Sequence, residues 1–431
     1  MPAHRDGALT VLARRKRSRL PPSRREHRRR RENLYRRSNR DEEGRSAMSA
    51  TPPPAIRLCV TGGGTGGHTY PALTTIDAVR RHARARGRDV DVLWVGTATG
   101  LEARVAPEHG IPFTAITTGK LRRSPNLREL GTNVADAFRV PLGVLQAISA
   151  VRRHRPDVVL STGGYVAVPI GLAAFLLRRP LVMHEQTTTL GLANRILARF
   201  ATRIAVSHDS SLEHLSGAVR RKAVVTGNPV RPEVLRGDPA RGRAMLGLAP
   251  GQPLVYVTGG AQGSKQINTL IEALLPHLLT RAYVLHQCGP AWADQLAQAA
   301  AALPGHLRAR YRPVPYLGAE LPDILAAADV VVSRSGAGTL AELTAIGKPS
   351  VLIPLIPSGG DEQRGNARHL AAAGAARALL EPGPTPEDLM RELALVLDDP
   401  GRRAHMAAAA RALGRTNAAD NLTALIMDTL R

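Results

Sequence analysis

The sequence predicts an α/β protein made of two doubly wound, Rossmann-like domains that face a cleft. With 431 residues, the chain is longer than one ordinary hydrophobic core requires, so two domains are expected. After residue 55, short β-branched runs alternate with Ala- and Leu-rich helical stretches. This alternation is typical of parallel sheets covered by helices on both faces. A glycine-rich turn also follows the first expected strand of each half.

The expected strands form two sets, one for each domain. In the first half they are Ile56–Val60, Val90–Gly96, Asp157–Ser161, Leu181–His184, Arg203–Val206 and Ala223–Thr226. In the second half they are Leu254–Thr258, Ala282–Gln287, Tyr311–Pro315, Val330–Ser333 and Ser350–Pro354. The segment between Pro229 and Pro250 is rich in Pro, Gly and Arg, so we predict an N-terminal domain over residues 56–230 and a C-terminal domain over residues 231–410. Residues 411–431 are expected to form a last amphipathic helix.

Residues 1–55 differ in composition from the rest of the chain. Residues 1–47 contain 16 Arg or Lys and 6 Asp or Glu and show no apolar periodicity, which predicts a disordered basic extension. Met48 is an alternative translation start, and a nucleic-acid tail or a polybasic membrane tether are the functional alternatives for this segment. No run of about 18 apolar residues occurs in the sequence, so no helix is expected to span a bilayer. Cys59 and Cys288 lie in apolar runs and predict buried thiols in a reducing cytoplasm.

The most informative motif is Thr61–His68, TGGGTGGH, which lies between the first strand and a helical stretch over Pro71–Arg84. Its glycines leave bare backbone before a helix N-terminus, which allows a phosphate or a sugar to approach closely. His68 places a titratable ring at the mouth of the same loop. Because a neutral imidazole near pH 7 accepts a proton, His68 is the candidate general base, and a phosphate contact or an ordering role in the loop is the alternative.

The glycine-rich turns of the two halves form two corresponding pairs. Val257–Ser264 follows the first strand of the second half, as Thr61–His68 follows the first strand of the first. Leu160–Pro169, later in the first half, has its counterpart in Ser333–Thr339. Ligands bind doubly wound sheets at the carboxyl ends of the strands. Two such domains would therefore line one cleft, which suits a reaction between two bulky substrates.

These motifs occur in one order that resembles a known family. They are Gly62–His68, the Gly-Gly-Tyr-Val run at 163–166, His184–Gln186, Gly227–Arg231, Gly259–Gly263, Ser333–Glu342 and Asp361–Asn366. Over roughly residues 57–431 the chain looks like the bacterial cell-wall enzymes that add N-acetylglucosamine to lipid I, making lipid II. The resemblance implies the glycosyltransferase B fold, UDP-N-acetylglucosamine as donor and undecaprenyl-diphospho-N-acetylmuramoyl-pentapeptide as acceptor. It also implies inversion at the anomeric carbon, no metal or other cofactor, and peripheral attachment to the anionic cytoplasmic face of the cell membrane.

The resemblance also implies a set of donor-binding residues in both halves. They are Thr65, Gly66, Gly67, Thr187, Asn194, Arg231, Ala261, Leu317, Ala337, Gly338, Thr339, Leu340, Ala341, Glu342 and Gln363. In physical terms, the helix start at Ser335–Thr339 can bind the diphosphate through backbone N–H groups and the helix dipole. Glu342 can accept hydrogen bonds from ribose hydroxyls. Each of the two charged residues also has a structural alternative. Glu342 could be a glutamate in the first helical turn that is stabilised by the helix dipole, and Arg231 could form an ion pair that bridges the domain seam.

The acceptor diphosphate is expected on glycine turns of the first domain. The acceptor-binding residues are Gly63, Gly64, Gly163, Gly164 and Tyr165. Glu185 and His184 are reserve candidates for the base. For the lipid tail and the membrane, the apolar run Phe138–Ile148 lies beside Arg139, Arg152 and Arg153. The alternative for this run is an ordinary helix of the hydrophobic core. The Asp89-Val-Asp91 pair formally matches a metal-binding motif, and a solvated strand end is the alternative for it.

Three positions depart from the family pattern, namely Ala261, Thr187 and Glu362, where Ser, Asn, and His or Gln are usual. A paralogue that uses another sugar or acceptor is therefore an alternative. UDP-N-acetylglucosamine 2-epimerases share the two-domain plan and are a second alternative. A nucleic-acid-binding body is disfavoured and no specific nucleic acid is expected, because aromatic residues make up only 3% of the chain.

Overall fold

The computed structural model describes residues 54–119, 127–358 and 361–430, and the side chains of residues 127–138 are not described. The basic segment 1–53, with Met48, lies outside the described residues. The described residues from Pro54 onward form one compact unit.

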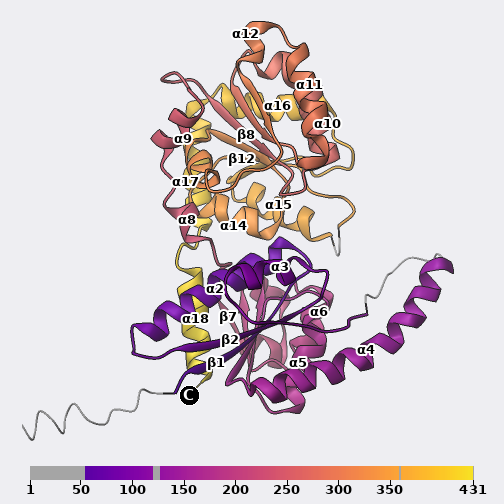
Figure 1. Cartoon of the computed structure of the whole chain (residues 1–431). Coiled ribbons are helices and arrows are strands. Elements are labelled where there is room, and N and C mark those ends of the chain that lie inside the picture. The colour runs from indigo at the N-terminus through magenta and orange to yellow at the C-terminus, as the bar shows by residue number, and fades with distance from the viewer. Residues whose placement is uncertain (1–53, 120–126, 359–360, 431) are drawn as a thin grey trace, which may run out of the picture. The chain divides into compact units, whose positions relative to one another are not determined.

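The N-terminal sheet has seven parallel strands in the order β3-β2-β1-β4-β5-β6-β7 (Figure 1). The strands are β1 Ile56–Thr61, β2 Val90–Gly96, β3 Phe113–Ala115, β4 Val158–Ser161, β5 Leu181–Glu185, β6 Arg203–Val206 and β7 Ala223–Val225. The helices of this half are α2 Gly66–Arg84, α3 Leu101–Glu108, α4 Leu127–His154, α5 Ala167–Leu176, α6 Leu192–Leu197, the 3-10 helix η1 Asp209–His214 and α7 Gly217–Arg221. The strand order reverses between β1 and β4, which is where doubly wound sheets bind ligands.

The C-terminal sheet repeats this plan with six parallel strands in the order β10-β9-β8-β11-β12-β13. The strands are β8 Leu254–Thr258, β9 Tyr283–Gln287, β10 Tyr311–Val314, β11 Val330–Ser333, β12 Ser350–Leu352 and β13 Ala376–Ala378. The helices are α8 Pro232–Leu235, α9 Pro239–Met245, α10 Lys265–Leu278, η2 Pro290–Trp292, α11 Ala293–Ala302, α12 Gly305–Arg308, α13 Leu321–Ala327, α14 Ala337–Ala345, α15 Glu362–Ala372, α16 Pro386–Leu397, α17 Pro400–Leu413 and α18 Ala418–Thr429. Here the order reverses between β8 and β11.

The predicted fold class is confirmed, and each predicted strand is present to within one or two residues. Sequence reasoning missed only β3 and β13, the outer strands at one edge of each sheet. Both have three residues, and β13 has the sequence Ala-Arg-Ala, which carries no β-branched run. Such strands form because a neighbouring strand offers its open edge, which local sequence does not report.

The last helix expected over residues 411–431 is α18, but it begins at Ala418, because residues 411–413 still belong to α17. Helix α17 ends at Leu413, and Gly414 follows with an extended backbone. A Cβ at Gly414 would lie 2.5 Å from the carbonyl oxygen of Thr344, so the chain passes too close to α14 for any larger residue. Helix α18 then packs on α2 and on strands of the N-terminal sheet, and Leu422 and Ile426 are buried in that core.

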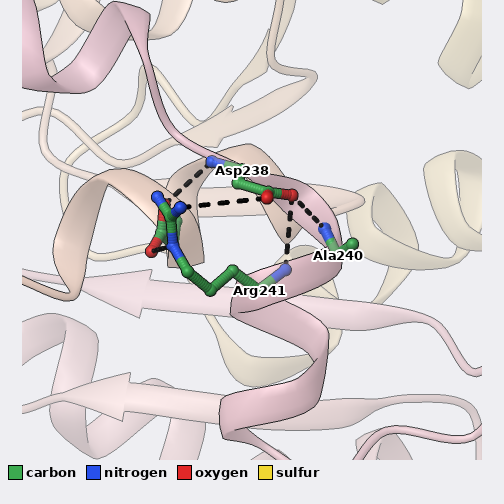
Figure 2. Close-up of polar contacts among 4 residues, drawn as sticks. Asp238, Ala240 and Arg241 are labelled. Atoms are coloured by element: carbon green, nitrogen blue, oxygen red, sulfur yellow. Dashed lines mark hydrogen bonds and ion pairs between the residues drawn. The ribbon is translucent and has the colours of Figure 1, made fainter.

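An ion pair anchors α9, the first longer helix after the N-terminal half. The Asp238 carboxylate accepts hydrogen bonds from the backbone N–H groups of Ala240 and Arg241 and so caps the helix (Figure 2). Arg241 in turn donates through Nε and Nη2 to the buried Asp323 of α13, and that contact lowers the pKa of Asp323. Residues 238–245 are therefore fixed to the C-terminal half.

Candidate active site

Two glycine turns meet at the switch point of the N-terminal sheet. The turn after β1 contains Gly62 to Gly64, and the turn after β4 contains Gly163 and Gly164, both with positive φ. A Cβ at Gly164 would lie 2.8 Å from the carbonyl oxygen of Gly63, so the turns approach each other too closely for larger residues. The Tyr165 ring lies against Gly64, because a Cβ there would be 3.5 Å from its Cε1. The predicted acceptor residues are thus gathered in one place.

His68 lies in the first turn of α2 and is half-buried. Its Nδ1 is 2.7 Å from the carbonyl oxygen of Thr162, and the Thr162 hydroxyl donates to the carbonyl oxygen of His68 at 2.9 Å. Because a carbonyl oxygen can only accept, Nδ1 carries the proton. In the neutral ring Nε2 therefore has a lone pair and can accept a proton. The contact fixes both the ring and its tautomer.

A buried carboxylate, which sequence reasoning missed, supports this loop from below. Glu102 of α3 is fully buried and accepts from the Gly64 N–H at 2.8 Å and from the Thr97 N–H and hydroxyl, both at 2.9 Å. A Cβ at Gly63 or Gly100 would lie within 2.4 Å of its carboxylate atoms. The Gly64 N–H is therefore already used, and a negative charge lies directly under the loop.

The two reserve candidates for the base are held by other contacts. Glu185 accepts four hydrogen bonds, from the Thr187 N–H and hydroxyl, the Gly191 N–H and the Asn194 amide, at 2.8 to 3.0 Å. His184 is fully buried, its Nε2 donates to the Gly227 carbonyl, and burial lowers its pKa to about 4. Both side chains therefore order the segment 184–194, to which the predicted donor residues Thr187 and Asn194 belong.

The switch point of the C-terminal sheet opens into a cavity of about 910 Å³. It is lined by the turn Thr258–Ser264, the start of α10, the segment Ser333–Thr339 and Gln363. Two of the predicted donor-binding residues, Thr339 and Gln363, line this cavity, and Ala337 and Gly338 precede Thr339 at the start of α14. Among its lining residues are Lys265 and Arg334, and no carboxylate is found among the residues described around it.

The start of α14 is fixed by contacts with α15. The Ser335 hydroxyl donates to the carbonyl oxygen of Gln363 at 2.7 Å, and the buried Asn366 amide donates to the carbonyl oxygen of Ser335 at 3.1 Å. The Gln363 side-chain oxygen accepts from the Leu355 N–H at 3.0 Å. The amide NH₂ of Gln363 is the part of this side chain left to donate into the cavity.

Arg231, at the domain seam, forms a bidentate ion pair with Glu342 of α14. Arg231 Nε lies 2.7 Å from Glu342 Oε1, and Nη2 lies 3.1 Å from Oε2. The guanidinium also stands 5.7 Å from the ring centroid of Tyr70 in α2. Burial lowers the pKa of Arg231, but its hydrogen bonds to the Glu342 carboxylate and the negative charge of that group, together with Tyr70 and Tyr316, outweigh burial and raise the pKa. The ion pair weighed as an alternative for Arg231 is thus present, with both partners in the C-terminal half. The first-turn alternative for Glu342 is wrong, because this residue lies beyond the first turn of α14, which contains no acidic residue.

The remaining predicted donor residues are more scattered. Ala337, Leu340 and Ala341 line a smaller cavity of about 30 Å³ at the seam, beside Asn228 and His208. Ala261 is exposed, and the buried Leu317 donates its N–H to the Gln287 side chain at 3.1 Å. Thr65 is the N-cap residue of α2, and Gly66 and Gly67 form its first turn beside His68.

The formal metal-like pair lies away from both switch points. Asp89 and Asp91 flank the amino end of β2, whereas the glycine turns follow the carboxyl ends of β1 and β4. Asp91 is 3.8 Å from His154 at the end of α4. These carboxylates do not join the candidate active site.

The two doubly wound sheets, each with glycine-rich turns at its switch point, define a two-domain enzyme of the glycosyltransferase B class. Residues 58–206 match the glycosyltransferase family 28 N-terminal domain, and residues 254–422 match the glycosyltransferase family 28 C-terminal domain. A relative from Desulforudis audaxviator is 37% identical over 86% of this chain and 98% of its own length. One from Desulfitobacterium hafniense is 36% identical over 87% and 99%.

Both relatives are named UDP-N-acetylglucosamine–N-acetylmuramyl-(pentapeptide) pyrophosphoryl-undecaprenol N-acetylglucosamine transferase. The crystal structure of Acinetobacter baumannii MurG is similar, with a TM-score of 0.67 and 26% identity over 86% of this chain and 99% of that one. The protein belongs to this family of transferases, within glycosyltransferase family 28.

Proposed function

We propose that the protein transfers N-acetylglucosamine from UDP-N-acetylglucosamine to the N-acetylmuramoyl 4-hydroxyl of undecaprenyl-diphospho-N-acetylmuramoyl-pentapeptide, which converts lipid I into lipid II in peptidoglycan synthesis. Family membership supports the class of reaction. The observation that carries the proposal is the division of labour between the halves. One switch point presents a proton-accepting His68, and the other presents a cationic cavity without described carboxylates.

In the proposed reaction, the acceptor hydroxyl oxygen attacks the anomeric carbon and forms the new glycosidic bond. The bond from that carbon to the diphosphate oxygen breaks, and its electron pair leaves with UDP. The proton of the hydroxyl passes to Nε2 of His68, the nitrogen that the Thr162 contact leaves unprotonated. Attack opposite the leaving group inverts the anomeric configuration.

The donor is assigned to the C-terminal half. The diphosphate lies over the start of α14, where Ala337 to Thr339 offer N–H groups without large side chains in the way. Fixed positive groups there replace a divalent metal ion in stabilising the leaving group. Glu342 contacts the ribose, for which its carboxylate must share or release Arg231.

The acceptor is assigned to the N-terminal half and to the membrane face beside it. We assign the acceptor diphosphate to the turn with Gly163 and Gly164, because the Glu102 carboxylate lies against Gly63 and already binds the Gly64 N–H. Helices α4 and α5 pack together, and apolar side chains of both are exposed, with Leu145 at 65% and Phe175 at 53%. Arginines on the same helix α4 would face anionic lipid headgroups.

This assignment predicts a protein held peripherally at the cytoplasmic face of the cell membrane. Within the described part of the chain, no helix is both long enough and apolar enough to cross a bilayer. Phe138 of the predicted apolar run lies among the residues whose side chains are not described.

The full chain incubated with lipid I and a panel of UDP-sugars tests the proposal. We expect one N-acetylhexosamine to be added to lipid I only from UDP-N-acetylglucosamine, as seen by mass spectrometry, with a β-linkage by NMR and undiminished turnover in EDTA. Transfer only to another acceptor would show a paralogue. Conversion of UDP-N-acetylglucosamine without any acceptor would show an epimerase.

A further inference from the structure

The C-terminal cavity contains a guanidinium that is bound only by neutral groups. Arg334, which follows β11, donates through Nη1 to the Gln266 side-chain oxygen at 2.7 Å and to the carbonyl oxygens of Ile353 and Pro354, both at 3.0 Å. Its Nη2 donates to the Ser264 hydroxyl at 2.7 Å. Within residues 54–119, 127–358 and 361–430, no carboxylate forms an ion pair with Arg334.

The environment of Arg334 leaves its positive charge uncompensated. The side chain is half-buried, and burial lowers its pKa. Arginine nevertheless keeps its proton, because its ordinary pKa is about 12.5 or higher. A charge withdrawn from water is costly unless it is paired, and four neutral oxygens solvate it only in part. An anion in the cavity would complete its environment.

The surroundings of Arg334 favour an anion as well. Lys265 also lines the cavity, and it is the first residue of α10, a helix of 14 residues. Helix α14 begins at Ala337, three residues after Arg334. The positive ends of both helix dipoles and two cationic side chains thus meet at a cavity of about 910 Å³.

The contacts of Arg334 also explain why the charge is fixed in place. Its partners belong to the turn before α10, to α10 itself and to the end of β12. The planar fork of the guanidinium therefore joins three segments that border the cavity. A lysine could keep the charge but could not make this set of contacts at once.

We propose that Arg334 is the fixed positive charge that binds the diphosphate of the donor. As the bond to the anomeric carbon breaks, negative charge grows on the diphosphate, and the preorganised guanidinium stabilises it. The proposal rests on the proposed function for the identity of the donor, but not for the affinity of the cavity for a diphosphate.

Calorimetric binding of inorganic pyrophosphate, UDP and uridine to the full chain tests this role. Arg334→Gln should weaken the binding of pyrophosphate and UDP by about 10- to 100-fold, the usual range for a charged hydrogen bond, and leave uridine within about twofold. Arg334→Lys should bind pyrophosphate and UDP with affinities between those of the wild-type protein and Arg334→Gln. Arg312→Gln, which removes an exposed arginine from the edge strand β10, should change none of the three affinities.

Several outcomes would overturn the proposal. An equal loss for UDP and uridine would make Arg334 a structural brace, and unchanged pyrophosphate and UDP affinity would remove it from the site. If Arg334→Gln does not fold, the comparison of Arg334→Lys with the wild-type protein tests the proposal. Failure of pyrophosphate to compete with UDP for the wild-type protein would contradict the proposal. A wild-type protein that binds pyrophosphate but not UDP would support the inference while refuting the proposed donor.

Discussion

The two halves of the molecule share a strand order but have opposite charges at corresponding turns. In the N-terminal half, the turn after the first strand rests on the buried carboxylate of Glu102. In the C-terminal half, the corresponding turn is held by the guanidinium of Arg334 through Ser264. The same backbone plan can therefore be adapted to different ligands by the charge placed under one turn.

This difference bears on where the negative charge of the donor is held. A glycine-rich turn before a helix is a general anion site, and both halves have one. The carboxylate below the first turn opposes an anion there, and it already occupies the Gly64 N–H. The first turn is thus better suited to positioning His68, and the second to binding a diphosphate.

The largest effect expected from breaking this division is on the chemical step. His68→Ala should slow transfer by about 10²- to 10⁴-fold, because the acceptor proton loses its base. UDP affinity should stay the same, since the nucleotide is assigned to the other half. Single-turnover transfer and UDP calorimetry measure the two quantities.

His214→Ala, which removes an exposed histidine from the same half, serves as the matched control. A near-normal rate for His68→Ala would return the role of base to Glu185, His184 or water. A large loss of UDP affinity would instead make His68 a donor-binding residue and weaken the contrast between the halves.

The second effect concerns the nucleoside end of the C-terminal site. Glu342→Ala should weaken UDP binding by about 1.5–3 kcal/mol, the range for a hydrogen bond to a charged group. Uridine should lose as much as UDP, because Glu342 is assigned to the ribose, whereas Arg334 is assigned to the phosphates. Calorimetry with both ligands separates the two roles.

Glu387→Ala, on the exposed surface of α16, is the control for loss of a carboxylate. Unchanged uridine and UDP affinity would leave Glu342 only as the seam partner of Arg231.

Sequence reasoning recovered the parts of this molecule that depend on local pattern. The long central strands, such as Val90–Gly96, are apolar runs whose burial needs no knowledge of the partner. The glycine turns were predicted because Gly63 and Gly164 mark close backbone approach wherever they occur. His68 was found because it adjoins such a turn.

The parts that sequence reasoning missed depend on partners distant in the chain. Glu102 meets Gly64 across 38 residues, and Arg334 meets Ser264 across 70. A charged residue between small ones, as in Ser333-Arg-Ser-Gly, or after a glycine, as in Gly100-Leu-Glu, is the signal that was available. That signal indicates a constrained charge but not what it contacts.

The third prediction removes the charge under the N-terminal turn. Glu102→Gln preserves the shape of the side chain but replaces one carboxylate oxygen by an NH₂ group. That NH₂ group cannot accept a hydrogen bond from the Gly64 or Thr97 donors that the oxygen bound. We expect the free energy of unfolding to fall by about 1–3 kcal/mol, the cost of a buried donor left unsatisfied. Urea denaturation measures this loss.

Glu108→Gln, at an exposed position of the same helix, is its control. If both variants were equally stable, Glu102 would not support the turn, and the contrast with Arg334 would fail.

The smallest effect is a pH dependence of stability at the seam between the halves. His208 and His369 stack edge to face with ring centroids 5.0 Å apart, beside the Arg415–Asp209 pair. Burial lowers the pKa of His208 to about 4, with the charges of His369 and Arg415 adding to the shift, and burial also lowers the pKa of His369. Both rings are therefore neutral in the folded protein near neutral pH.

A histidine whose pKa is lower in the folded protein than in the unfolded chain destabilises the fold only at pH values where the unfolded chain binds more protons than the folded protein. Stability should thus be full above about pH 6.5, fall as the pH drops toward about 4, and level off below. Between about pH 7 and pH 5, His208 alone should cost about 1–2 kcal/mol in urea denaturation. His208→Asn should remove that part of the pH dependence, whereas His214→Asn should not. Equal slopes for the wild-type protein and His208→Asn would show that the seam does not hold His208 neutral.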